Sequence, residues 1–153
     1  MKSDEHYMRQ CIAQAQAASL RGEVPVGAII VDPTSGDVLS AVGNAPISIC
    51  DPTAHAEILA IRDAAHKLDN YRLTGLHLYV TLEPCAMCAG AIAQARIGRV
   101  IYGASDVKGG AVENGVQYFK SASCHSKPEI RAGVLADECA LLLTQFFKAR
   151  RKK

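Results

Sequence analysis

The chain has 153 residues, a formal net charge of +2 and six cysteines, and 49% of its residues are hydrophobic. This length and apolar content suit one ordinary domain with a sizeable core, so we expect residues 1–153 to form a single domain. No apolar run approaches the roughly 18 residues that a membrane span needs, and the N-terminal segment MKSDEHYMRQ is too polar for a secretory signal. We therefore expect a cytoplasmic protein whose cysteines are free thiols.

Two kinds of hydrophobic periodicity alternate along the chain. Helical periodicity predicts helices over residues 4–20, 54–68 and 84–96, and a closing helix that begins near residue 137. Short apolar runs predict strands over residues 24–31, 37–42, 76–82 and 99–104. Only the turn DPTSG separates the first two strands, which should therefore form a hairpin. This order indicates one α/β domain with helices on both faces of a central sheet.

Two local signals predict where the middle helices begin. Thr53 precedes the second helix and is a suitable N-cap residue. Pro84 suits the first position of the third helix, because a proline there loses no intrahelical hydrogen bond. Residues 105–128 are rich in glycine, serine and lysine, and their pattern is the least informative of the chain.

The stretch TLEPCAMCAG places Cys85 and Cys88 three residues apart at the start of the third helix. Residues at this spacing share one helix face, so both sulfur atoms can reach one point. The positive end of the helix dipole also favours the thiolate, which is the form that binds metal. Alone, however, a pair of cysteines at this spacing is equally compatible with a redox pair or with two core thiols.

A second group of polar residues, His55 and Glu57, lies in the segment TAHAEI at the start of the second helix. If the preceding strands are adjacent, the starts of the two helices meet at the carboxyl edge of the sheet. His55, Cys85 and Cys88 would then form a site for one zinc ion per chain, with a fourth position left for water. Glu57 is spaced to reach that water and carry its proton. A closed structural site is the alternative, with its fourth ligand drawn from Cys50, Cys124, His125 or Cys139.

His55-x-Glu57 followed by Pro84-Cys85-x-x-Cys88 is the signature of the zinc-dependent base deaminases. The segments EVPVGAIIV, DPTAHAEILA, LYVTLEPCAMCAGAI and GVLADECALLL further resemble the bacterial tRNA-specific adenosine deaminases, which convert the wobble adenosine of an anticodon to inosine. The resemblance implies a cytidine deaminase-like fold with three α/β/α layers and a central mixed five-stranded sheet. Residues 111–128 depart from the common pattern of that family, and Ser105 stands where an arginine is frequent.

The resemblance also implies roles for individual residues. The reaction would be a hydrolytic deamination in which zinc activates water and Glu57 moves the protons. Substrate contacts would fall to Val26, Asn44, Ala56, Asp106, Phe147 and Arg150. Ordinary structural roles remain open for several positions: a turn at Asn44 or Asp106, core packing at Val26 or Phe146, and a helix cap at Glu83.

The implied partners are a tRNA anticodon stem-loop and a second copy of the chain in a homodimer. The C-terminal segment FFKARRKK places five cations after two aromatic residues, which suits phosphates and an unstacked base, although a basic end can also be a solvated tail. Two other functions remain open. One is a deaminase of a free nucleobase or nucleoside such as guanine or cytosine, which the segment 111–128 favours. The other is a zinc-stabilised binding module without turnover.

Overall fold

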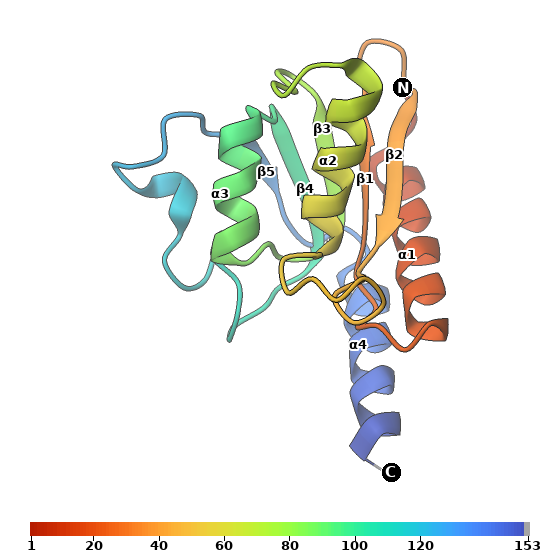
Figure 1. Cartoon of the computed structure of the whole chain (residues 1–153). Helices are drawn as coiled ribbons and strands as arrows, with labels where there is room; N and C mark the ends of the chain where they lie inside the picture. Colours follow the sequence, from red (N-terminus) through yellow and green to blue (C-terminus); the bar gives the residue numbers. More distant parts are fainter. Residues whose placement is uncertain (152–153) are drawn as a thin grey trace.

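The computed structural model describes residues 1–151, which fold around one five-stranded sheet (Figure 1). Its elements run in the order α1 (Asp4–Leu20), β1 (Gly27–Val31), β2 (Val38–Gly43), α2 (Ala56–Leu68), β3 (His77–Leu82), α3 (Ala86–Ala95), β4 (Arg99–Ala104), η1 (Tyr118–Lys120), β5 (Glu129–Arg131) and α4 (Ala136–Arg151). In this described part, no helix is both long and apolar enough to cross a bilayer.

The strand order in the sheet is β2-β1-β3-β4-β5. Strand β1 pairs antiparallel with both β2 and β3, whereas β3, β4 and β5 are parallel. Because β2 and β3 are both antiparallel to β1, they point the same way and end at the same edge of the sheet. These two strands are not adjacent, since β1 lies between them, so the condition set for the meeting of the two helix starts is not fulfilled. Helices α2 and α3 nevertheless begin at one common edge.

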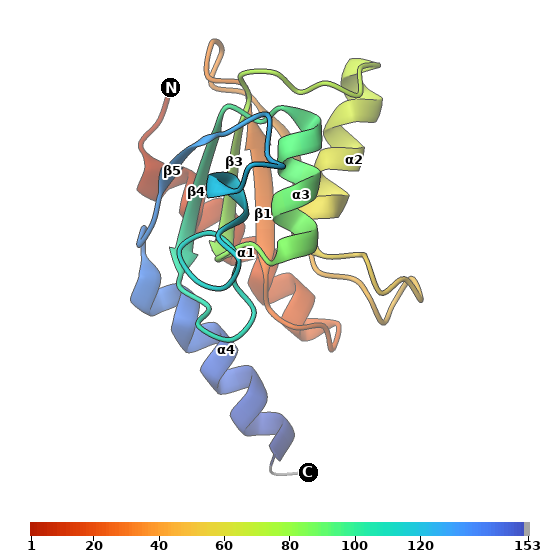
Figure 2. The same cartoon turned by 90° about the vertical axis from the view of Figure 1, so that its left-hand side faces the viewer.

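Helices cover both faces of the sheet, so the predicted three-layer α/β/α fold with a mixed five-stranded sheet is confirmed. Helices α2 and α3 pack on one face in a core that includes Ala60, Leu78 and Ile92. Helices α1 and α4 pack on the other face, where Met8 and Cys139 lie in a second core. Figure 2 shows that the C-terminal half of α4 extends beyond the sheet.

The middle helices begin later than the sequence pattern predicts. Helix α2 begins at Ala56, and the N-cap position is held by His55. The prediction of Thr53 as the N-cap is wrong, because the hydroxyl of Thr53 donates instead to Asp51, at 2.7 Å. Helix α3 begins at Ala86 with Cys85 at its N-cap position, so Pro84 lies just outside the helix.

Candidate active site

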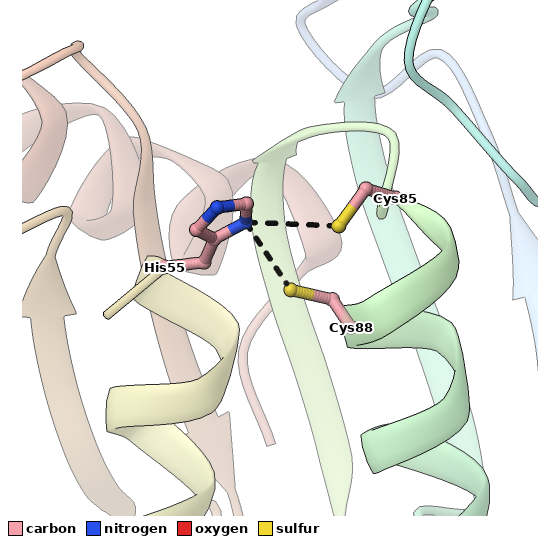
Figure 3. Close-up of side chains that lie close together, drawn as sticks. All are labelled: His55, Cys85 and Cys88. Atoms are coloured by element: carbon pink, nitrogen blue, oxygen red, sulfur yellow. Dashed lines mark hydrogen bonds between the residues drawn. The ribbon is translucent and has the colours of Figure 1, made fainter. Parts of the chain in front are cut away.

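His55, Cys85 and Cys88 converge between the first turns of α2 and α3 (Figure 3). The Nδ1 atom of His55 lies 3.6 Å from Sγ of Cys85 and 3.5 Å from Sγ of Cys88. Within residues 1–151, these three side chains make up the one cluster of three or more His, Cys, Asp or Glu residues close enough together to hold a metal ion. The three residues that the sequence predicts as zinc ligands are therefore brought together.

The spacing of these atoms can be tested against the geometry of zinc. A tetrahedral ion with Zn–N near 2.0–2.1 Å and Zn–S near 2.3 Å places its nitrogen and sulfur ligands about 3.6 Å apart. The two observed nitrogen–sulfur distances, 3.6 and 3.5 Å, agree with that value. Three such protein ligands are typical of catalytic zinc, in which water or substrate takes the fourth position. The residues present thus fit a zinc ion.

The helix termini explain why these side chains can meet. His55 and Cys85 are N-cap residues with extended backbone, so their side chains leave the helix ends rather than the helix sides. Hydrogen bonding, first with Cys88 and then with His55, lowers the pKa of the Cys85 thiol to about 4. The neighbouring Cys85 sulfur and burial raise the pKa of Cys88. These opposite shifts favour ionisation of Cys85 before Cys88, and a bound cation would favour loss of the second proton.

Glu57 lies in the first turn of α2 and is 4% exposed. Burial, with a smaller effect from the negative charge of Cys85, raises the pKa of its carboxyl group to about 7. A group with a pKa near the working pH can both accept and donate protons. This position and acidity suit the proton-carrying role that the sequence predicts for Glu57.

A cavity of about 370 Å³ opens beside the cluster. It is lined by most of the residues expected at the site, namely Val26, Asn44, His55, Glu57, Cys85 and Asp106. Five further lining residues are not in that expected set: Val24, Pro46, Leu82, Glu83 and Gly109. The sequence signal that could have found two of them is proximity, because Val24 lies two residues before Val26 and Leu82 lies two residues before Pro84. Both give the wall an apolar character that suits a nucleobase.

Asn44 and Ala56, two of the expected substrate contacts, are bonded to each other. The side-chain oxygen of Asn44 accepts a hydrogen bond from the backbone N–H of Ala56, at 2.7 Å. The amide nitrogen of Asn44 is therefore the group that can face a substrate in the cavity. Asp106 has a structural role as well, because its carboxylate accepts the backbone N–H groups of Lys108 and Gly109 and closes a turn.

The two expected contacts on α4 lie in different places. Phe147 is 45% exposed and lines a hollow of about 390 Å³ that shares Asp106 with the cavity. Arg150 points toward the end of α1, where it donates to the carbonyl of Gly22 at 2.5 Å. Its guanidinium also lies 4.5 Å from the ring centre of Phe146, which is only partly buried and belongs to neither core. The tail residues Lys152 and Lys153 lie outside the described residues.

None of the alternative fourth ligands is part of the metal cluster in the portion of the chain that the structure describes. Cys50 is exposed, and its thiol faces the carbonyl of Ile47 at 3.8 Å. The buried thiol of Cys124 donates to the carbonyl of Ser126. Cys139 is in the core on the opposite face of the sheet. The geometry therefore favours an open site over a closed structural one.

Comparisons with known proteins agree with this geometry. Residues 1–104 match the family model of the cytidine and deoxycytidylate deaminase zinc-binding region. The tRNA-specific adenosine deaminase of Agrobacterium fabrum is 47% identical over 151 residues, which cover 99% of this chain and 98% of that protein. A solved structure from a study of A-to-I editing by tRNA:A34 deaminases is 48% identical, with a TM-score of 0.88, over 90% of this chain and 99% of that one. A structure of guanine deaminase from Nitrosomonas europaea shares the fold alone, at 22% identity and a TM-score of 0.82, over 95% of this chain and 85% of that one.

Proposed function

The chain belongs to the zinc-binding family of cytidine and deoxycytidylate deaminases, and we propose that it converts the wobble adenosine of a tRNA anticodon to inosine with release of ammonia. The observation that carries the proposal is the similarity to a tRNA-specific adenosine deaminase along nearly the whole of both chains. The His55, Cys85 and Cys88 cluster beside a buried glutamate supports the same chemistry.

The residues around the cavity have two roles in the proposed hydrolysis, metal binding and proton transfer. His55, Cys85 and Cys88 would hold one zinc ion per chain, which would supply the Lewis acidity that makes water nucleophilic at neutral pH. Glu57 lies at the cavity wall, where it accepts a proton from the attacking water and returns one to the base and the departing ammonia. Its burial keeps bulk water away from this proton transfer and holds its pKa near neutrality.

The cavity has the size and lining that a single flipped nucleotide requires. Its volume of about 370 Å³ falls within the range of roughly 300–1,000 Å³ that is usual for small-molecule sites. Val26 offers an apolar surface to the base, and the amide nitrogen of Asn44 offers a hydrogen-bond donor. A base must leave the anticodon stack to enter such a pocket, which an unpaired loop permits at low cost.

The anticodon stem-loop would lie along the hollow beside the cavity and the basic end of α4. Phe147 provides a ring on which a neighbouring base can stack, and Lys148, Arg150 and Arg151 provide cations for phosphates. On the family resemblance we further propose a homodimer in which the partner subunit completes the RNA site, and a cytoplasmic location. Sedimentation of the zinc-loaded protein with and without a stem-loop measures the first of these directly.

One assay separates the candidate functions. We expect ammonia release from an anticodon stem-loop with adenosine at the wobble position, and none from the same stem-loop with guanosine there. Release from free guanine, cytosine or nucleosides, but not from the stem-loop, would establish the alternative of a small-molecule deaminase. Zinc binding without ammonia release from any of these would instead identify a binding module.

A further inference from the structure

Glu83 occupies an unusual position directly after β3 and two residues before Cys85. Its side chain is almost fully buried, with the residue 2% exposed. One carboxylate oxygen accepts the backbone N–H of Asp106 at 2.9 Å and the amide nitrogen of Asn114 at 2.7 Å. The other oxygen accepts three successive backbone N–H groups, those of Val112, Glu113 and Asn114, at 3.0–3.1 Å. Glu83 therefore does not cap α3, a role that the sequence left open for it.

All the hydrogen bonds of this buried carboxylate go to the loop 106–114. Among the described residues, no lysine, arginine or histidine forms a salt bridge with it. Burying a charge without a counter-charge is costly unless hydrogen bonds satisfy it. Here four backbone amides of the loop and the side-chain amide of Asn114 supply those bonds, and the observed backbone arrangement directs all of these donors to one carboxylate. The carboxylate thus specifies the conformation of the loop.

Gly110 makes this arrangement possible. A Cβ atom at this position would lie 2.4 Å from the carboxyl carbon of Glu83 and 2.5 Å from the carbonyl oxygen of Asp106. Neither separation is tolerable for a real side chain. The glycine lets the loop backbone close around the carboxylate. Glu83 and Gly110, from two distant parts of the chain, are therefore both needed for this close contact.

The same loop forms one wall of the catalytic cavity. Asp106 and Gly109 line this cavity together with Glu83 and Cys85. Because Glu83 is two residues from Cys85, it couples the position of that wall to the position of a metal ligand. The first residues of the segment 111–128 belong to this loop, and Val112 and Glu113 donate to the same carboxylate.

We propose that Glu83 is a positioning residue, which fixes the loop 106–114 as a pocket wall in register with the metal centre. The inference rests on the proposed function, since it assigns the loop to the pocket for the target nucleotide. Glu83 does not touch the reacting atoms. It acts through Asp106 and Gly109, whose places along the cavity decide where the substrate sits relative to the attacking water.

The test uses two variants, one that changes the carboxylate of Glu83 and one that changes the loop that contacts it. Glu83→Gln replaces an acceptor oxygen by a donor, and Gly110→Ala forces the loop away from an intact carboxylate. Gly90→Ala on α3 is the matched control, because no atom lies within 4 Å of an added Cβ there. Zinc content, amide hydrogen exchange at residues 106 and 112–114, and kcat/KM on the stem-loop are measured well below the unfolding temperature.

We expect both variants to keep one zinc per chain and to exchange these amides at least about 10-fold faster than the unaltered protein. We expect kcat/KM to fall by about 10- to 100-fold, because small displacements of a bound substrate cost rates of this order. Gly90→Ala should change none of the three. Should Glu83→Gln fail to fold, Asn114→Ala removes a single hydrogen bond to Oε1 and should give a smaller loss in the same direction.

Faster exchange in both variants with kcat/KM within twofold of the unaltered protein would overturn the proposal. Glu83 would then hold the loop in the unaltered protein, but the loop would not position the substrate. Unchanged exchange would overturn it as well. If the unaltered protein deaminates a free base and not the stem-loop, the proposed function fails on its own. The role of Glu83 is then decided by the same variants on that base.

Discussion

The side-chain oxygen of Asn44 accepts the backbone N–H of Ala56 at 2.7 Å, which joins the loop after β2 to the first residue of α2. Ala56 directly follows His55, one of the three residues that fit a zinc ion, and directly precedes Glu57. One amide side chain therefore holds the backbone on which both residues depend. Asn44 also lines the cavity, and its amide nitrogen is the donor that we propose for the substrate.

This double role predicts that Asn44→Asp and Asn44→Ala differ. An aspartate can still accept from Ala56, so Asn44→Asp should keep zinc and fold but lose turnover, because it donates nothing to a substrate. Asn44→Ala should lose turnover and also about 1 kcal/mol of unfolding free energy, since a helix start loses its side-chain acceptor. Denaturant titration and stem-loop kinetics measure the two effects. An active Asn44→Asp protein would exclude the substrate contact.

The metal cluster predicts that zinc supports stability as well as activity. Cys85→Ser and Cys88→Ser should each lose the metal, and the unfolding temperature should fall because zinc ties two helix starts together. A strong chelator should lower the unfolding temperature of the unaltered protein in the same way. Cys50→Ser is the matched control, since its thiol is exposed and outside the cluster. Loss of zinc from Cys50→Ser would mean a closed four-ligand site, and the catalytic interpretation would fail.

The placement of Glu57 predicts a separation of metal binding from turnover. Glu57→Ala should retain one zinc per chain and a native unfolding transition, because all three ligands remain. Its turnover on the stem-loop should fall by at least about 10²- to 10⁴-fold, the usual effect of removing an acid–base group. Metal analysis and single-turnover kinetics on the same sample test this. An active, zinc-loaded Glu57→Ala protein would rule out the proton-carrying role.

Much of the fold and the metal cluster could be predicted because their signals are local. Strands β1, β3 and β4 are buried on both faces, so they read as continuous apolar runs. The ligands lie in two short motifs at helix starts. Strand β5 has three residues, all exposed, and its place beside β4 comes from parallel pairing rather than from hydrophobic periodicity. Only the family resemblance implied a fifth strand.

The loop beyond β4 could not be predicted because distant residues organise it. Glu83 lies 23 to 31 positions from the groups that it holds, and no sequence periodicity records such an interaction. A second group of hydrogen bonds joins Ser105 to the segment 111–128. Ser105 donates to the carboxylate of Glu113, at 2.5 Å, and the hydroxyl of Tyr102 bonds the same oxygen. Ser105 and Glu113 of this segment therefore belong to one hydrogen-bonded unit.

Asp4 at the start of α1 predicts a pH-dependent contribution to stability. Burial raises the pKa of its carboxyl group, but hydrogen bonds from Arg99, Tyr79 and Arg131 outweigh that effect and lower the pKa from 3.8 to about 2. Because the folded pKa is the lower one, the stabilisation is present above pH 3.8 and is lost as the pH falls toward 2. Asp4→Asn should therefore cost about 2 kcal/mol at pH 7, and the difference from the unaltered protein should shrink below pH 4.

Denaturant unfolding of both proteins at a series of pH values measures this difference, and zinc loss in acid affects the two alike. Glu138→Gln is a suitable control, because the exposed pair that Glu138 forms with Arg9 should contribute less than about 1 kcal/mol. A difference for Asp4→Asn that stays constant down to pH 2 would contradict the linkage.

The basic end of α4 predicts salt-dependent binding of RNA. Removing residues 148–153 deletes Lys148, Arg150 and Arg151, which follow Phe147 along the chain, together with the last two lysines. The truncated protein should keep its zinc but bind and deaminate the stem-loop more weakly. Its log–log salt slope should flatten by roughly 0.7–0.9 for each phosphate that the tail no longer neutralises. Lys67→Gln is the matched control, because Lys67 lies at the far end of α2 and pairs with Asp63. A truncated protein that binds the stem-loop as tightly as the full chain, with the same salt slope, would remove the tail from the RNA site.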